Sequence, residues 1–137
     1  MLINLSNHPS SNWSPKQLES ASIYGELVDL PFPVVDPDAG TDSIRLLADE
    51  FKTKIVSLVS GMPTEKHAVH LMGEITFCFA LAVMLQSRGI DCIASTTERI
   101  VVEKGRQKTV EFNFTRFRQY PDLKDLTNSM RQQSQKR

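Results

Sequence analysis

The sequence has no excess of charge, few cysteines and no long apolar run, and each of these absences argues against a class of protein. Sixteen basic residues balance sixteen acidic ones. A protein that coats long nucleic acid needs many uncompensated Lys and Arg contacts to phosphate, so long nucleic acid is not an expected partner. The longest apolar run, residues 75–85, is too short to cross a bilayer and contains Thr76. We expect no membrane contact.

The first residues lack the basic flank and the long apolar core of a signal peptide, and we expect a cytoplasmic protein. Its two cysteines, Cys78 and Cys92, each lie inside an apolar segment, which is typical of buried, reduced thiols. His67 and His70 stand three residues apart in a strand-like segment and therefore point to opposite faces. This spacing is wrong for a shared metal ion, and we predict no metal site and no cofactor.

What is present is a regular alternation of strand and helix patterns. Ser14, Pro15 and Gln17 mark the start of a first helix as N-cap, first helical residue and capping-box residue, and Gly25 ends it. Apolar residues at three- and four-residue steps predict a second helix from about Thr41. Strands are predicted at residues 1–5, 27–30, 67–72 and 91–95, a third helix at 74–87, and a hairpin whose strands, 100–102 and 109–117, flank a turn at 104–107.

Strands that alternate with helices predict a parallel sheet with right-handed crossovers. The expected fold is therefore α/β: a compact, Rossmann-like, mostly parallel sheet with helices on both faces and a C-terminal β-hairpin. Residues 1–120 form the predicted domain, and residues 121–137 are a polar C-terminal tail whose last residues we expect to be frayed. The third helix is apolar nearly all round, which predicts burial against the sheet and against a second subunit.

Three polar clusters follow predicted strands, where open α/β sheets bind their ligands. Hydroxyl and amide groups of this kind suit phosphate and nucleobase recognition, although the same residue types also cap helices and form turns. The candidate ligand-binding residues are Ser6, Asn7, Ser10, Ser11 and Asn12 after the first strand, Gly73 and Thr76 after the third, and Ser95, Thr96 and Thr97 after the fourth.

Three residues near these clusters are candidate catalytic groups. His8 lies in the first loop, where it suits a general acid, a general base or a phosphate contact, or is simply a solvated loop residue. Glu74 is a candidate base or ribose contact, or an acidic residue favoured by the helix N-terminus. Arg99 is suited to a bidentate phosphate contact. Asp29, at the end of the second strand, is a weak candidate for a ribose contact because no G-x-G-x-x-G motif follows the first strand.

The segments INLSNHPSSNWS, MGE followed by ITFCFALAVML, and CIASTTER resemble in order the small CRISPR-associated Rossmann-fold (CARF-like) proteins, some of which are stand-alone ring nucleases of type III CRISPR antiviral defence. The resemblance covers roughly residues 1–100. It implies a homodimer whose two-fold pocket, above the strand ends, binds a cyclic oligoadenylate and cleaves it without a metal ion. It also implies roles for individual residues: phosphate contacts by Asn7 and by Ser10 or Ser11, charge neutralisation by Thr96 and Arg99, and proton transfer by His8 or Glu74.

The sequence leaves three other functions open. A module with the same pocket would sense the cyclic nucleotide without cutting it. An enzyme that processes nucleosides or nucleotides, similar to small deoxyribosyltransferases, would need a carboxylate nucleophile, for which Glu74 and Glu98 are candidates. A structural subunit would use the Ser and Thr clusters only as caps.

Overall fold

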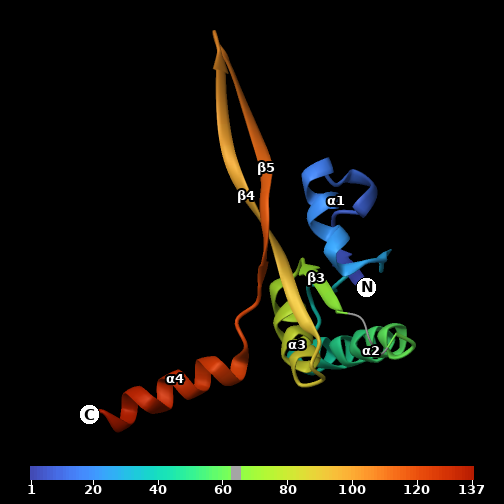
Figure 1. Cartoon of the computed structure of the whole chain (residues 1–137), viewed down its shortest axis with the longest axis vertical. Helices are drawn as coiled ribbons and strands as arrows, with labels where there is room; N and C mark the ends of the chain where they lie inside the picture. Colours follow the sequence, from blue (N-terminus) through green and yellow to red (C-terminus); the bar gives the residue numbers. More distant parts are fainter. Residues whose placement is uncertain (63–65) are drawn as a thin grey trace.

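A five-stranded sheet organises the chain in the computed structural model, which describes residues 1–62 and 66–137 (Figure 1). In chain order, the elements are β1 (Leu2–Ser6), the 3-10 turn η1 (Ser10–Asn12), α1 (Pro15–Ala21), the 3-10 turn η2 (Ser22–Tyr24), β2 (Leu27–Asp29), α2 (Thr41–Ser60), β3 (Ala68–Met72), α3 (Ile75–Gln86), β4 (Asp91–Lys104), β5 (Gln107–Gln119) and α4 (Leu123–Gln135).

The strands lie in the order β2-β1-β3-β4-β5. β1 pairs in parallel with both β2 and β3, and β3 pairs in parallel with β4. The chain runs from the central strand β1 to β2 at the edge of the sheet, and it then crosses back past β1 to β3. The strand order therefore reverses between β1 and β3. In open α/β sheets a reversal of this kind separates the loops at the carboxyl ends of the two strands and opens a crevice for a ligand.

The prediction of a compact, mostly parallel, Rossmann-like sheet is wrong. The sheet is mixed, because β4 and β5 are antiparallel. This antiparallel pairing has twelve residue pairs, whereas the parallel pairings β1–β2, β1–β3 and β3–β4 have three, five and three. The fourth strand was predicted to end at Ser95, where a run of hydroxyl residues begins. Threonine is β-branched and favours extended backbone, so β4 continues through Thr96 and Thr97 as far as Lys104.

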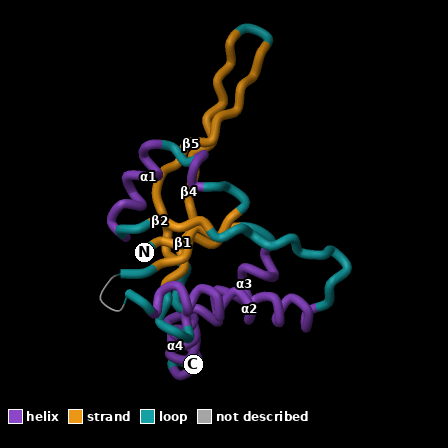
Figure 2. Tube along the Cα trace, turned by 90° about the vertical axis from the view of Figure 1, so that its right-hand side faces the viewer, coloured by secondary structure: helices purple, strands orange, loops and turns teal. Residues whose placement is uncertain are grey.

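The outer part of this hairpin, residues 97–104 and 107–114, forms an arm that projects away from the helices (Figures 1 and 2). A register shift between Thr96 and Thr97 marks the point where the arm begins, as expected of a bulge that bends a strand. Gly105 and Arg106 connect the strands, and the φ of +63° at Gly105 fits a type II′ turn.

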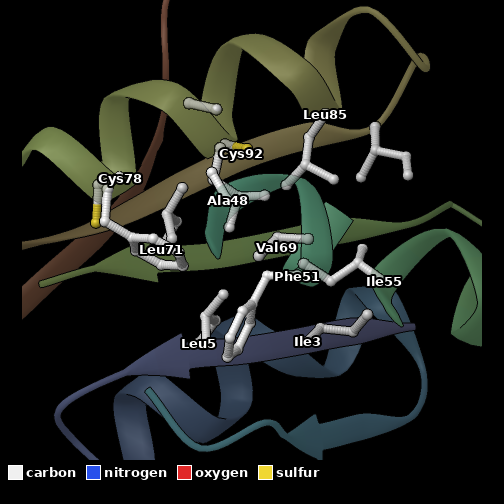
Figure 3. Close-up of a cluster of buried hydrophobic side chains, with 14 of the residues drawn as sticks. Ile3, Leu5, Ala48, Phe51, Ile55, Val69, Leu71, Cys78, Leu85 and Cys92 are labelled. Carbon is white, nitrogen blue, oxygen red and sulfur yellow. The ribbon is translucent and has the colours of Figure 1, made fainter. Parts of the chain in front are cut away.

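Alternation along the strands divides the core into two layers. Ile3 and Leu5 of β1 and Val69 and Leu71 of β3 point toward α2 and α3, where they meet Phe51, Ile55, Cys78 and Leu85 (Figure 3). The opposite face of the sheet is covered by a smaller cluster that includes Leu2, Trp13, Ala21 and Ile93. Within the described ranges, no helix is long and apolar enough to cross a bilayer.

The segment predicted as a polar tail contains the helix α4, which extends away from the sheet (Figure 1). Asp122 caps this helix by accepting a hydrogen bond from the backbone N–H of Lys124 at 2.7 Å. Leu123, Leu126 and Met130 form an exposed stripe on one side of it. Their spacing of three and four residues is helical, although the polar composition of residues 121–137 led to the prediction of a tail.

Gly73 is required where β3 turns into α3, because a methyl group there would overlap the ring of Phe32. We expect Gly73→Ala to lower the free energy of unfolding by about 1–3 kcal/mol by displacing this ring from Phe77. In Phe32→Ala the space is already free, so adding Gly73→Ala to it should cost almost nothing further. Urea unfolding of the two single variants and the double variant measures this coupling, and additive losses would contradict it.

Candidate functional site

A row of polar residues crosses the sheet on the face covered by α1. The strand register aligns Asp29 of β2 with Asn4 of β1, and Asn4 with His70 of β3. Side chains two residues apart share a face, so Ser6 and Ser95 lie on the same side of the sheet as this row. Asn4 is only 2% exposed and His70 only 1%. Two polar residues at such depth need hydrogen-bond partners.

Hydrogen bonds join the row into a chain. Asn4 Nδ2 donates to Asp29 Oδ1 at 2.8 Å and to the backbone carbonyl of His8 at 2.8 Å. Asn4 Oδ1 lies 2.9 Å from His70 Nδ1. On the far side of the imidazole, His70 Nε2 lies 2.7 Å from Ser95 Oγ.

These partners determine where the proton of His70 lies. Both donors of the Asn4 amide are engaged, so its oxygen is the atom that faces His70 and accepts a hydrogen bond. His70 therefore donates from Nδ1. In a neutral ring Nε2 is then an acceptor, and the Ser95 hydroxyl donates to it. The side-chain amide of Gln17, on α1, donates to Ser95 Oγ at 3.0 Å.

The surroundings of His70 keep its ring neutral. Burial, with a further contribution from His8, lowers the pKa of His70 from 6.5 to about 4. Trp13 and Phe117 pack against the imidazole with ring centroids 5.0 and 5.6 Å away. At neutral pH the histidine is thus an uncharged ring with its acceptor nitrogen directed at a hydroxyl.

The loop after β1 is held in place through its backbone. The His8 carbonyl accepts from Asn4 Nδ2 and from Trp13 Nε1, the latter at 3.2 Å, and Ser6 Oγ lies within 3.1 Å of it. Ser6 Oγ also lies 2.8 Å from Asn4 Oδ1 and accepts from the His8 N–H at 3.2 Å. The exposed residues in this loop are Pro9 and four with polar side chains: Asn7, His8, Ser11 and Asn12. The loop therefore presents polar groups from a fixed backbone.

Asp29 fastens the other end of this loop. Its carboxylate accepts from the Ser10 hydroxyl at 2.6 Å and from the Ser10 N–H at 3.1 Å, in addition to Asn4. Partial burial raises its pKa, but the hydrogen bonds from Ser10 and Asn4 outweigh this and lower it. Asp29 is therefore ionised at neutral pH and oriented within the row.

Glu74, Gly73 and Thr76 lie at the carboxyl end of β3. The Glu74 carboxylate caps α3 by accepting from the N–H groups of Phe77 and Thr76 and from the Thr76 hydroxyl. The hydrogen bond from Phe77 N–H, followed by that from the Thr76 hydroxyl, lowers its pKa. A carboxylate engaged in this way is a poor proton acceptor, so the geometry gives Glu74 a capping role.

The predicted residues of the fourth strand are divided between the sheet and the arm. Ser95 belongs to the row, whereas Thr96 Oγ1 is bonded to the backbone of Arg116 and Thr97 lies at the register shift. Arg99 lies opposite Phe112 in the arm, four residues beyond Ser95, or about 13 Å along a strand. Within one chain the structure does not bring Arg99 to His70.

Sequence reasoning missed Asn4 and Gln17, and it considered His70 only as a metal ligand. A signal was available, because Asn4 lies between the apolar residues Ile3 and Leu5, and His70 lies between Val69 and Leu71. An isolated polar residue in a buried strand needs a partner, and two such strands that pair in register offer one. The only signal for Gln17 was its capping-box position at the start of α1. In the structure its side chain donates to Ser95 instead of bonding back to the N-cap residue.

Two clefts lie beside the sheet, one at the amino ends of its strands and one that runs from there along β5. One, of about 450 Å³, is lined by residues that include Lys66, His67 and Arg88. The other, of about 570 Å³, includes Tyr24, Asp91 and Arg116. Both thiols are free and buried, and burial raises the pKa of Cys78 to about 11 and that of Cys92 to about 12. Among the described residues, no three His, Cys, Asp or Glu side chains are grouped to hold a metal ion.

The fold and the site together define an α/β protein with a mixed sheet and a hydrogen-bonded Asp-Asn-His-Ser row across the face of the sheet that α1 covers. Residues 1–118 match the model of the Uncharacterized protein MJ1673 family, and the chain belongs to that family. The match includes the whole row and the arm but not α4. No curated protein and no solved structure matches the chain.

Proposed function

We propose that this protein binds a cyclic oligoadenylate at the carboxyl ends of β1 and β3 and opens the ring without a metal ion. The observation that supports the proposal best is the fixed loop of residues 7–12 at the reversal of strand order, directly beside a buried neutral imidazole. The reversal is where a sheet of this kind accommodates a ligand. The resemblance of the INLSNHPSSNWS segment to ring nucleases provides the choice of ligand.

The loop has the chemistry that a ring of phosphodiesters and adenines requires. Asn7, Ser11 and Asn12 offer amides and hydroxyls that bond phosphate oxygens and base edges without adding net charge. Because the hydrogen bonds to the His8 carbonyl and Asp29 order the loop in advance, binding loses less conformational entropy. A rigid, polar and nearly neutral site fits a small multivalent ligand better than it fits long nucleic acid.

The exposed side of α3 supports a homodimer as part of this proposal. Ile75 and Phe79 are 77% and 69% exposed and lie four residues apart on this helix. Ile75 directly follows the Gly73–Glu74 turn, so a symmetric pairing through this patch brings two carboxyl edges close together. The pairing provides a site for a ring with two-fold symmetry, and it offers each site a second arm bearing Arg99. We place the reaction in the cytoplasm, as part of antiviral defence.

A test of the proposal is to incubate the purified protein with cyclic tri-, tetra- and hexa-adenylate in EDTA and to separate the products by chromatography. We expect linear products from one ring size. Asn7→Ala, in the proposed site, should slow the reaction at least about tenfold, the effect of losing one to two hydrogen bonds to a charged group. Asn128→Ala, at an exposed asparagine on α4, is the matched control. Intact rings that raise the melting temperature would identify a sensor instead, and intact rings with no shift would overturn both functions.

A further inference from the structure

The proton acceptor of the site is not one of the residues that the sequence singled out for this role. We propose that Ser95 is an activated hydroxyl with His70 as its general base, and that Ser95 takes the proton from the ribose 2′-hydroxyl that attacks the ring phosphate. The activation of Ser95 stands on geometry alone, whereas its part in ring opening rests on the function proposed above.

The geometry is that of a nucleophile, a base and an orienting group. Ser95 Oγ lies 2.7 Å from His70 Nε2, and His70 Nδ1 lies 2.9 Å from Asn4 Oδ1. Catalytic Ser-His-Asp and Cys-His-Asn sets have this order of contacts on unrelated folds. Asn4 fixes the tautomer of the ring, and Asp29 in turn polarises the amide of Asn4.

Burial leaves one member of the set accessible. His70 and Asn4 are buried, whereas Ser95 is half-buried. A hydroxyl oxygen has two lone pairs, and the Gln17 amide uses one of those on Ser95. The other lone pair is available to accept a proton. Ser95 is therefore the member of the set through which His70 acts on a ligand.

The other groups around the imidazole do not compete for the proton. Asp29 and Glu74 are ionised carboxylates whose oxygens already accept several hydrogen bonds, and these bonds lower the pKa of each. On β5, the Arg116 guanidinium offers only donors and donates from Nε to the carbonyl of Phe117. His8, in the loop, contributes an electrostatic effect that disfavours a charged His70. Ser95 with neutral His70 is thus the acceptor that the geometry favours.

The reaction step balances without any co-reactant. The 2′-hydroxyl gives its proton to Ser95 Oγ while the Ser95 proton passes to His70 Nε2. The 2′-oxygen forms a bond to phosphorus, and the bond from phosphorus to the 5′-oxygen breaks. The 5′-oxygen then takes the proton back from the imidazolium through Ser95. The product is a linear oligoadenylate with a 2′,3′-cyclic phosphate and a 5′-hydroxyl.

The first experiment examines Ser95 without any nucleotide. Diisopropyl fluorophosphate phosphorylates activated serines: Ser Oγ bonds to phosphorus, fluoride leaves, and the proton passes to the base. Mass spectrometry of the full chain should show one adduct, on Ser95, that is absent in Ser95→Ala. His70→Gln should slow labelling by about 100-fold, the lower range of general-base catalysis, and Ser57→Ala, at an exposed serine on α2, should label like the unmodified protein. Circular dichroism verifies that each variant is folded.

Absence of an adduct on Ser95, or labelling that is independent of His70, would overturn the inference. The rate of ring opening in EDTA tests the second part. The unmodified protein should react at nearly constant rate from pH 6 to 8, because neutral His70 is present throughout. The rate for Ser95→Ala should rise about tenfold per pH unit, because hydroxide then replaces the base. If Ser95 is labelled but rings stay intact, the activated serine is retained and the ring-nuclease function fails. If rings open but Ser95→Ala keeps the flat profile, the ring-nuclease function is retained and the proton transfer through Ser95 fails.

Discussion

Replacing Phe77 with alanine is expected to lower the free energy of unfolding by about 3–5 kcal/mol. Phe77 is fully buried on α3 at the centre of the larger core layer. Phe32 and Phe51 pack edge-on against it from two sides, with ring centroids 5.3 and 5.4 Å away. Its removal leaves a cavity that these two rings fill only in part, and aromatic contacts of this kind add to the loss.

Phe79 provides a matched control, because it is the same residue type on the same helix but 69% exposed. Phe79→Ala should change the free energy of unfolding of the monomer by less than about 0.5 kcal/mol. Urea unfolding of both variants at low protein concentration makes the comparison. Equal losses for the two variants would show that α3 does not pack against the sheet as described.

The second large effect is a dependence of stability on pH that His70 causes. The pKa of His70 is about 4 in the folded protein and 6.5 in the unfolded chain. Between these values the unfolded chain binds a proton that the folded protein does not, so stability is fully present above pH 6.5 and falls as the pH drops toward 4. The difference of about 2.5 pKa units corresponds to a loss of about 3 kcal/mol.

His70→Gln removes this contribution while keeping a polar side chain in the row. The loss of stability between pH 7 and pH 4 should then be about 3 kcal/mol smaller in His70→Gln than in the unmodified protein. Ser95→Ala, which keeps the imidazole, should retain the full dependence. Urea unfolding at a series of pH values measures all three proteins. A His70→Gln protein with an unchanged dependence on pH would mean that the ring is solvated rather than buried.

Local patterns predicted the helices well where a cap or an apolar period marks them. The capping role of Ser14 toward Gln17 and the buried face of α2 follow directly from such signals. The fourth strand was misjudged because the hydroxyl residues after Ser95 were interpreted as a loop. Their β-branched side chains tolerate either state, and pairing with β5 determines the outcome. In α4 the few apolar residues are exposed and stand among polar ones. The polar composition of the segment therefore concealed the helical spacing of these apolar residues.

The site was predictable only in part for a related reason. The loop residues 6–12 lie where polar residues follow a strand, and this signal is local. The row of Asn4, His70 and Ser95 depends on register between strands up to 66 residues apart in the chain. No local pattern contains that register. It appears only when parallel pairing places the single polar residues of neighbouring strands beside each other.

The central claim is that the ligand binds at the carboxyl ends of β1 and β3, and a nuclear magnetic resonance titration of the backbone amides tests it most directly. The ring that the protein binds or cleaves would be added in a non-cleavable form to isotope-labelled full-length protein. We predict shifts concentrated in residues 6–12, 73–76 and 95–97, with little change at Lys66 and Asp91 in the two clefts beside the sheet. Shifts concentrated around Lys66 and Asp91, with residues 6–12 unchanged, would contradict the account.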